Sequence, residues 1–415
     1  MKNLISFAPA AIAILLLSPA QAHSLTKGFN AAFVPLNGTV GLTIGIVNAD
    51  PMVAINASFL DNLPTGLIVA SPNGFSTNGA CGTAGANFTA ILLGNTIQLS
   101  TSSIPPGPFC TFFVNLKATS LGPKPNTVTG GGDLTGLTGT DTTTVVAPVL
   151  TKTFAAPTVA LSSITQFTIT VDNSANTIAM PNLGFNDVIP GGLTGGNIAS
   201  NSCGGTITGL PAAVNLAGGI VGAGAMCSVV VNVTATTTGG KLNTVFGDPG
   251  TNLENQFAAD KTNVVAPVLS KAFAPTIVSA GQAGTLTFTI NNNTTIPLDN
   301  LLGFTDTVPA GITVTGLNTN GCPGTVVTTA TTVTYTTVGG NILAVGAVCT
   351  ITVNIVGVTL GGPYTNTVIG NKSLTGQTPT AQITVIAPPD SFLVRYGESH
   401  QRGRGDRPQQ HRRQR

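Results

Sequence analysis

A lysine, an aspartate and an asparagine recur in the same order three times along the 415-residue chain, and together they could form a covalent crosslink. Burial away from water lowers the pKa of a lysine and raises that of an aspartate. A neutral lysine amine could then attack the asparagine carboxamide while the protonated aspartate polarises it. The product would be a Lys–Asn isopeptide bond, with ammonia as the by-product. The three sets are Lys27, Asp61 and Asn126; Lys152, Asp187 and Asn243; and Lys271, Asp306 and Asn366.

Two other interpretations of these residues stay open. The lysine and aspartate could form a buried ion pair, with the asparagine completing its hydrogen bonds, because buried charges have to be paired. Alternatively, the three side chains do not meet, and the lysine is solvated on a strand edge while the aspartate lies in a turn. Alternation along a strand places Lys152 on the same side as the apolar Leu150 and Phe154, which favours burial. The spacing does not choose between a crosslink and an ion pair.

These residues lie in three copies of one unit, which repeats about every 120 residues. A period of this length is typical of an independent domain and is too long for a solenoid repeat. Each copy starts on Leu-x-Lys-x-Phe and ends on Ala-Pro. We therefore predict three tandem domains, at residues 23–149, 150–268 and 269–389.

Apolar and polar residues alternate within each copy. Phe167, Ile169 and Val171 would face one side of a strand, while Thr168 and Thr170 would face the other. Short runs of period two, separated by Gly, Pro and Asn, indicate antiparallel strands that are covered on one face. The expected fold class is all-β, with three tandem immunoglobulin-like β-sandwich domains.

The motifs of the copies resemble those of a known family. A Lys near the start, Phe-x-Asp-x-[Leu/Ile/Val]-Pro-x-Gly in the middle and Asn-Thr-Val near the end resemble a bacterial conserved-repeat family, domain of unknown function eleven. The resemblance covers residues 25–389 and implies an immunoglobulin-like fold and a role in surface architecture or adhesion, without a defined ligand. The order of lysine, acid and asparagine also resembles that in self-crosslinking immunoglobulin-like domains of bacterial pilins and adhesins.

The six cysteines fall two per copy, and six cysteines allow fifteen pairings. Domains that close on themselves select a single pairing, and export to an oxidising compartment favours disulfides. Metal binding is the competing interpretation, but the copies contain neither a Cys-x-x-Cys motif nor a histidine. We expect the disulfides to stabilise the domains and to have no redox role. The predicted pairs are Cys81 and Cys110, Cys203 and Cys227, and Cys322 and Cys349.

Composition excludes several classes of function. Only 7% of the residues are charged, and all seven arginines lie between Arg395 and Arg415. The part from Leu25 to Pro389 holds eight lysines and eleven acidic residues, a net charge of −3, so it lacks the basic surface of a nucleic-acid binder. It contains no histidine for a Ser-His or Cys-His pair, no phosphate-binding loop and few acids for a calcium cage. We therefore expect no enzyme activity, no cofactor and no metal.

The two ends of the chain differ from the copies. Residues 1–22 resemble a secretory signal peptide, with Lys2, an apolar run at 10–17 and an Ala-x-Ala cleavage site. The apolar run is shorter than the roughly 20 residues of a membrane-spanning helix, so we expect no transmembrane segment in the mature chain. Residues 390–415 form a basic tail that we expect to be disordered. The tail contains Arg404-Gly405-Asp406, a tripeptide of integrin ligands that arises easily by chance, and its composition also fits an out-of-frame end.

These features predict a secreted or cell-surface bacterial repeat protein that acts as a rigid stalk or an adhesin segment. Its expected partners are other surface proteins or host and matrix components. The alternative function is a glycan- or protein-binding module that uses loops at one end of the sandwiches. The absence of Trp argues against an aromatic platform for sugars.

Overall fold

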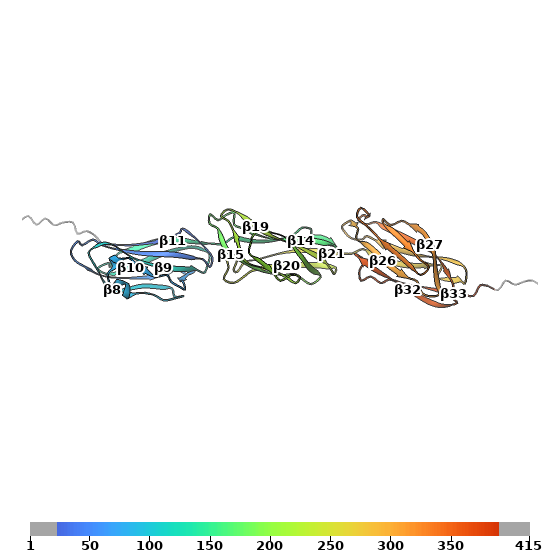
Figure 1. Cartoon of the computed structure of the whole chain (residues 1–415), viewed down its shortest axis with the longest axis horizontal. Coiled ribbons are helices and arrows are strands. Elements are labelled where there is room, and N and C mark those ends of the chain that lie inside the picture. Colours follow the sequence, from blue (N-terminus) through green and yellow to red (C-terminus); the bar gives the residue numbers. More distant parts are fainter. Residues whose placement is uncertain (1–22, 390–415) are drawn as a thin grey trace, which may run out of the picture. The chain divides into compact units, whose positions relative to one another are not determined.

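The computed structural model describes residues 23–389. Of these residues, those up to Ala266, with the first two repeats, form one compact unit, and those from Pro267 to 389, with the third repeat, form another. Within the described residues the chain is built of strands, apart from two short 3-10 helices at Gly79–Cys81 and Ala84–Asn87. Each repeat is a sandwich of two sheets, which confirms the all-β prediction (Figure 1).

The first repeat shows the arrangement that all three share. Its smaller sheet contains β1 (Ser24–Phe29), β3 (Thr39–Asn48), β9 (Gly107–Ala118) and β5 (Leu67–Val69) in this order, and β6 (Ser76–Thr77) pairs with β9. Its larger sheet contains, in order, β2 (Phe33–Pro35), β11 (Thr138–Val146), β10 (Gly122–Gly132), β4 (Ile55–Asn62), β8 (Thr96–Ile104) and β7 (Phe88–Ala90). The strands pair antiparallel except β2, which runs parallel to β11.

The second repeat has the same order of strands. Its smaller sheet contains β12 (Val149–Phe154), β14 (Ile164–Asp172), β19 (Met226–Ala235) and β16 (Leu193–Asn201). Its larger sheet contains β13 (Thr158–Ala160), β21 (Phe257–Val265), β20 (Gly239–Gly247), β15 (Met180–Val188), β18 (Ala213–Val221) and β17 (Thr206–Thr208).

The third repeat follows the same plan with one addition. Its smaller sheet contains β22 (Val268–Ala274), β24 (Ala283–Asn291), β31 (Val348–Gly357) and β27 (Ile312–Asn320). Its larger sheet contains β23 (Ile277–Ser279), β33 (Thr380–Ile386), β32 (Gly361–Lys372), β26 (Leu302–Thr307), β29 (Thr332–Thr336) and β28 (Thr325–Thr328). The short strands β25 (Leu298–Asp299) and β30 (Ile342–Leu343) form an extra pair.

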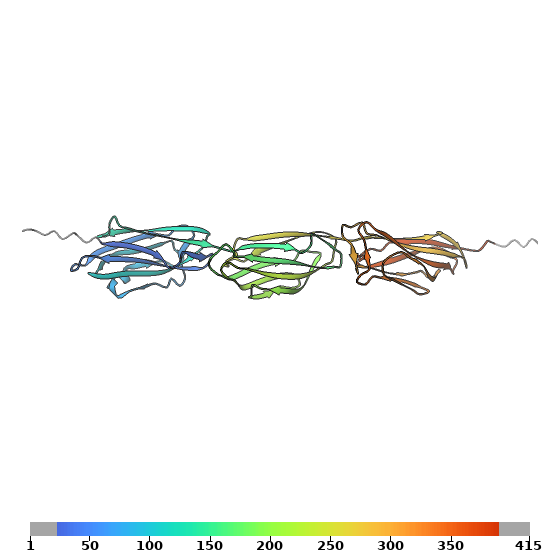
Figure 2. The same ribbon diagram turned by 90° about the horizontal axis from the view of Figure 1, so that it is seen from above.

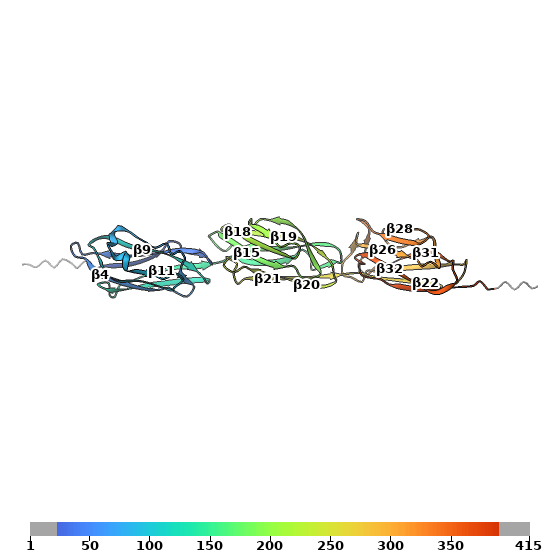
Figure 3. The ribbon, with the colours of Figure 1, turned by 60° about the horizontal axis from the view of Figure 1, so that its bottom comes forward.

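Figures 2 and 3 show the layers of strands in each domain, and the buried apolar side chains of each domain lie between its two sheets. Phe167, Ile169 and Val171, the apolar side of the alternating run, are fully buried. The paired strand β19 contributes Val229 and Val231 to the same core. Since both sheets bury one face only, a residue on the inner side of a strand meets the opposite sheet.

A disulfide joins the two cysteines of each repeat. The bonds close loops with sequence separations of 29, 24 and 27 residues between Cys81 and Cys110, Cys203 and Cys227, and Cys322 and Cys349. In each pair the second cysteine lies near the start of the central strand of the smaller sheet, β9, β19 or β31.

Removing one disulfide is expected to weaken its own domain. In a chain with Cys203→Ser and Cys227→Ser, the free energy of unfolding of the second domain should fall by about 3–4 kcal/mol, because the bond closes a loop of 24 residues. Urea unfolding, followed by hydrogen exchange of peptides from each domain, measures this loss. An unchanged midpoint for the second domain would contradict the stabilising role, and the other two domains serve as internal controls.

A glutamine fixes the start of the second and third domains. Gln256 accepts a hydrogen bond from the Leu150 backbone N–H at 3.1 Å and donates one to the Pro148 carbonyl at 2.8 Å. Gln377 makes the same two contacts with Leu269 and Pro267. The predicted boundaries at 149/150 and 268/269 fall within the first two residues of β12 and β22.

The predicted signal peptide (1–22) and basic tail (390–415), including the Arg-Gly-Asp tripeptide, lie outside the described residues. Among residues 23–389, no helix has the length and apolar character needed to span a membrane.

Candidate functional site

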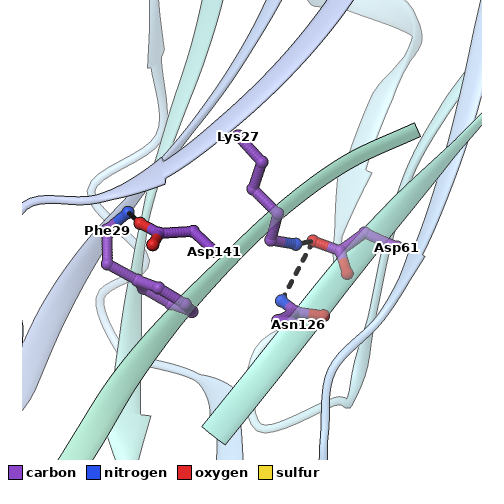
Figure 4. A network of polar contacts seen from close by, with 5 residues as sticks. All are labelled: Lys27, Phe29, Asp61, Asn126 and Asp141. Carbon is purple, nitrogen blue, oxygen red and sulfur yellow. Dashed lines mark hydrogen bonds and ion pairs between the residues drawn. The ribbon is translucent and has the colours of Figure 1, made fainter. Parts of the chain in front are cut away.

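The first lysine, aspartate and asparagine meet between the sheets of repeat 1. Lys27 lies on β1 in the smaller sheet, whereas Asp61 and Asn126 lie on β4 and β10, which are neighbours in the larger sheet. The Lys27 ammonium is paired with Asp61 Oδ2, and Asn126 Nδ2 donates a hydrogen bond to the same oxygen at 3.3 Å (Figure 4). The side chains of Lys27 and Asp61 expose no surface to solvent.

The register of the larger sheet explains why the acid and the amide are close. Asp61 lies opposite Val128 on β10, so Asn126 is two residues away on the same face of the sheet. The same register places Asp187 opposite Val245 and Asp306 opposite Val368 in the other repeats. Inward-facing positions on two paired strands are therefore brought to the lysine by sheet packing.

The second and third repeats hold the same set of residues. Lys152 on β12 is paired with Asp187 on β15, and Lys271 on β22 is paired with Asp306 on β26. Asn366 on β32 donates a hydrogen bond from Nδ2 to Asp306 Oδ2 at 3.0 Å. On β20, Asn243 occupies the equivalent place in repeat 2, and its carboxamide makes no hydrogen bond.

The structure therefore rejects one of the three interpretations left open by the spacing. All three lysines are paired with a buried aspartate rather than solvated on a strand edge, and all three aspartates lie on strands rather than in turns. A buried polar cluster and a crosslinking site both fit this arrangement.

Burial changes the proton affinity of each pair. It lowers the pKa of Lys27, and it lowers the pKa of Lys152 and Lys271 to about 8, although attraction to the paired aspartate opposes the change. Burial also raises the pKa of each aspartate, and the paired lysine again opposes the change. The free-energy gap between the ion pair and the neutral amine–acid pair is therefore smaller than in water.

The asparagine of each set has a buried carbonyl oxygen without a hydrogen-bond partner. Oδ1 of Asn126, Asn243 and Asn366 lacks a partner, and so does Oδ1 of Asp61 and of Asp187. An unsatisfied buried polar group costs about 1–3 kcal/mol, so each domain carries this cost in its core. A simple ion pair does not require an additional amide with an unpaired oxygen.

Aromatic rings border two of the three lysines. Lys152 Nζ lies 3.7 Å from the centroid of the Phe167 ring, and Lys271 Nζ lies 5.3 Å from that of Phe288. The faces of these rings attract a cation but supply no hydrogen-bond acceptor comparable to water. The lysine amines are therefore held in apolar surroundings with an aspartate as their charged partner.

Two groups of buried or paired polar residues were not predicted from the sequence. The first is a buried asparagine, Asn48, Asn173 or Asn292, at or just after the end of a long strand. In repeat 2, Asn173 Nδ2 donates to the carbonyls of Ile178 and Gly222, both at 2.8 Å. The sequence signal that could have identified this asparagine is its recurrence after an alternating apolar run in each repeat.

The second group is a further aspartate, present in two repeats. Asp141 accepts a hydrogen bond from the Phe29 backbone N–H at 2.6 Å, and Asp260 accepts one from Phe154 at 2.7 Å. The equivalent position in repeat 3 is Ala381. Within the described residues, no group of three or more His, Cys, Asp or Glu side chains could hold a metal ion.

Two of the solved structures that match the chain come from streptococcal proteins. The C-terminal domain of the Streptococcus agalactiae AgI/II polypeptide BspA is 11% identical, with a TM-score of 0.40, and the match covers 58% of this chain and 100% of that one. The C-terminal domain of the Streptococcus pyogenes antigen I/II-family protein AspA is 11% identical, with a TM-score of 0.36, and the match covers 59% and 99%. Because both TM-scores are low, the assignment of the fold depends on the structure of this chain alone.

The repeats also match a family model. The model of a domain of unknown function, DUF7933, matches three times in tandem, at residues 24–147, 148–265 and 267–386. No curated protein matches the chain. The resemblance of the motifs to domain of unknown function eleven stays an expectation.

Proposed function

The chain belongs to the family of domain of unknown function DUF7933, and we propose that it is an exported structural protein whose three domains lock themselves with internal Lys–Asn crosslinks. In this role the domains act as a stalk or adhesin segment at the cell surface. Disulfides in all three repeats favour an oxidising, extracytoplasmic location, since such bonds are rare in the cytosol.

The observation that carries the proposal is the recurrence of one buried site. In every repeat a lysine from the first strand meets an aspartate, and an asparagine lies beside that aspartate. In repeats 1 and 3 the asparagine contacts the aspartate through Nδ2, so its unpaired Oδ1 would meet the protonated acid after the carboxamide rotates about the Cβ–Cγ bond.

The chemistry needs only groups that are present in the site. In repeat 2, the proton of the Lys152 ammonium moves to Asp187, which leaves a neutral amine and a neutral acid. The amine nitrogen attacks Cγ of Asn243, and the protonated Asp187 donates a hydrogen bond to Oδ1 as negative charge develops there. The attacking nitrogen, which is positively charged after the attack, passes a proton to Nδ2, and the bond from Cγ to Nδ2 then breaks to release ammonia. Asp187 still holds the proton that it took from Lys152, and it returns to the carboxylate when it gives this proton to the departing ammonia, which leaves as ammonium. No oxidant or cofactor is consumed.

The position of the crosslink suits a structural role. Lys27 lies on the first strand of the smaller sheet, and Asn126 lies on β10 of the larger sheet, the last strand but one. A bond between them would join the two sheets and enclose most of the domain in one covalent loop. Force applied through the chain ends would then pass through the bond instead of separating β1 from its neighbours.

Intact mass tests the proposal. For the full chain with its disulfides reduced, we expect a mass lower than that of the processed sequence by three molecules of ammonia, one for each repeat. Each of three variants should lack one of these ammonia losses, because it has no carboxamide in one repeat: Asn126→Leu, Asn243→Leu and Asn366→Leu. A mass that matches the unmodified sequence would contradict crosslinking, and a loss of water instead of ammonia would place the bond on the aspartate.

A further inference from the structure

A second carboxylate lies next to the lysine strand in the first two repeats. Asp141 on β11 is directly opposite Asn126 on β10, and Asp260 on β21 is directly opposite Asn243 on β20. Figure 4 shows Asp141 beside the backbone nitrogen of Phe29, two residues after Lys27. This carboxylate joins the edge strand of the smaller sheet to a strand of the larger sheet at the level of the site.

The third repeat lacks this group. The residue opposite Asn366 is Ala381, so the strand β33 brings no charge to the site. Lys271 is paired with Asp306, and the Phe288 ring lies near its amine. The three sites thus share their reacting groups and differ in one negative charge nearby.

The negative charge of this second aspartate acts on the lysine of the same repeat. Asp141 and Asp260 each raise the pKa of the lysine of their repeat, in addition to the larger effect of the paired aspartate. The groups that face Lys152 are Asp187 from β15, Asp260 from β21, Asn243 from β20 and the Phe167 ring from β14. A nearby negative charge favours the ammonium over the amine, and only the amine can attack a carboxamide.

We propose that Asp141 and Asp260 slow crosslink formation in their own repeats, so that the third repeat, with Ala381, closes its crosslink first. This inference rests on the crosslinking function proposed above. The two aspartates are positioning residues, which act through the lysine and the strand that bears it. Repeats 1 and 2 would then gain a longer interval in which β1 or β12 can adjust before it is covalently attached.

The order of crosslinking can be measured in the unaltered full chain. The protein would be synthesised in a cell-free system under oxidising conditions, with a short pulse of label, and samples would be quenched at intervals by acid denaturation. After digestion, mass spectrometry gives the linked and unlinked lysine peptides of each repeat. The disulfide of each repeat marks its folding, so rates are compared from the time at which that bond has formed.

Variants separate the charge of the aspartate from its hydrogen bond. Asp260→Asn keeps an oxygen that can accept from the Phe154 N–H but removes the charge, and it should accelerate crosslinking of repeat 2 several-fold, because the neutral amine becomes more populated. Its rate profile should also shift to lower pH, which a purely structural contact would not produce. Ala381→Asp should slow repeat 3, and Asp172→Asn, at the half-buried end of β14, is the matched control because it removes a charge and keeps the acceptor for the Ser174 N–H.

Each outcome decides the question. Repeat 3 closing first, with opposite effects of Asp260→Asn and Ala381→Asp, supports the inference. Crosslinks that form at equal rates in all repeats, or that respond to neither variant, would overturn it and leave the proposed function intact. An absence of crosslinks from every repeat would overturn both. The comparison among native repeats needs no variant, so a variant that fails to fold does not prevent the test.

Discussion

Replacing Asp187 with alanine is expected to leave the second domain without its crosslink and to remove most of its stability. Loss of one partner from a buried ion pair costs about 3–5 kcal/mol, because Lys152 would be left uncompensated in the core. The lost crosslink would add about 4–5 kcal/mol, the value for closing a loop of roughly 100 residues. The sum is comparable to the entire free energy of unfolding of a typical domain.

The measurement combines mass and unfolding in the full chain. After allowance for the substitution itself, the intact mass should be higher than that of the unaltered protein by one molecule of ammonia, because one crosslink is missing. Hydrogen exchange in urea should show that peptides of the second domain lose protection first. Asp172→Asn, which removes the charge of a half-buried acid in the same domain but keeps an oxygen that can accept from the Ser174 N–H, should change neither result. Retention of the full ammonia loss in Asp187→Ala would show that the aspartate is not needed for bond formation.

A matched variant separates the two contributions. Lys152→Met combined with Asp187→Leu removes the crosslink and leaves no buried charge, and an apolar replacement of a buried ion pair is often neutral or stabilising. This double variant should therefore recover the electrostatic part of the loss and keep the part due to the missing crosslink. If it is as unstable as Asp187→Ala, the cost lies in packing rather than in the unpaired lysine.

In a chain with Asn243→Leu, the free energy of unfolding of the second domain should rise as the pH increases from about 8 to 10.5. This variant cannot form the crosslink, so Lys152 stays free. Burial lowers the pKa of Lys152 from 10.5 to about 8, so between these values the unfolded chain holds a proton that the folded domain has lost. Stability rises with pH wherever the unfolded state binds more protons, and this difference corresponds to about 3 kcal/mol.

The unaltered chain is the comparison for this pH dependence. A crosslinked Lys152 is an amide nitrogen that no longer titrates, so the rise should be absent from the second domain of the native protein. The raised pKa of Asp187 acts at lower pH and in the opposite sense, since there the folded domain keeps a proton that the unfolded chain has lost. The same rise in the native chain would mean that Lys152 is free, and no rise in Asn243→Leu would contradict its lowered pKa.

The sequence determined the features that depend on local pattern and on repetition. Alternation of apolar residues and threonine, as in Phe167–Val171, predicts strands with one buried face, because successive side chains point to opposite sides of a strand. Repetition of the unit predicts three domains, and the rule that each domain closes on itself predicts the disulfides that are observed. The same alternation indicates which side of its strand each lysine, aspartate and asparagine faces.

Only the tertiary structure decided which of these inward-facing groups meet. Asp61 and Asn126 are adjacent because β4 and β10 pair in the larger sheet, and Lys27 reaches them because the edge strand β1 packs from the other sheet. Asp141 joins this site through its position opposite Asn126. Alternation along a strand indicates which face of the sheet a residue lies on. Which strands become neighbours, and how two packed sheets align, depends on long-range packing of the whole core, which no local pattern encodes.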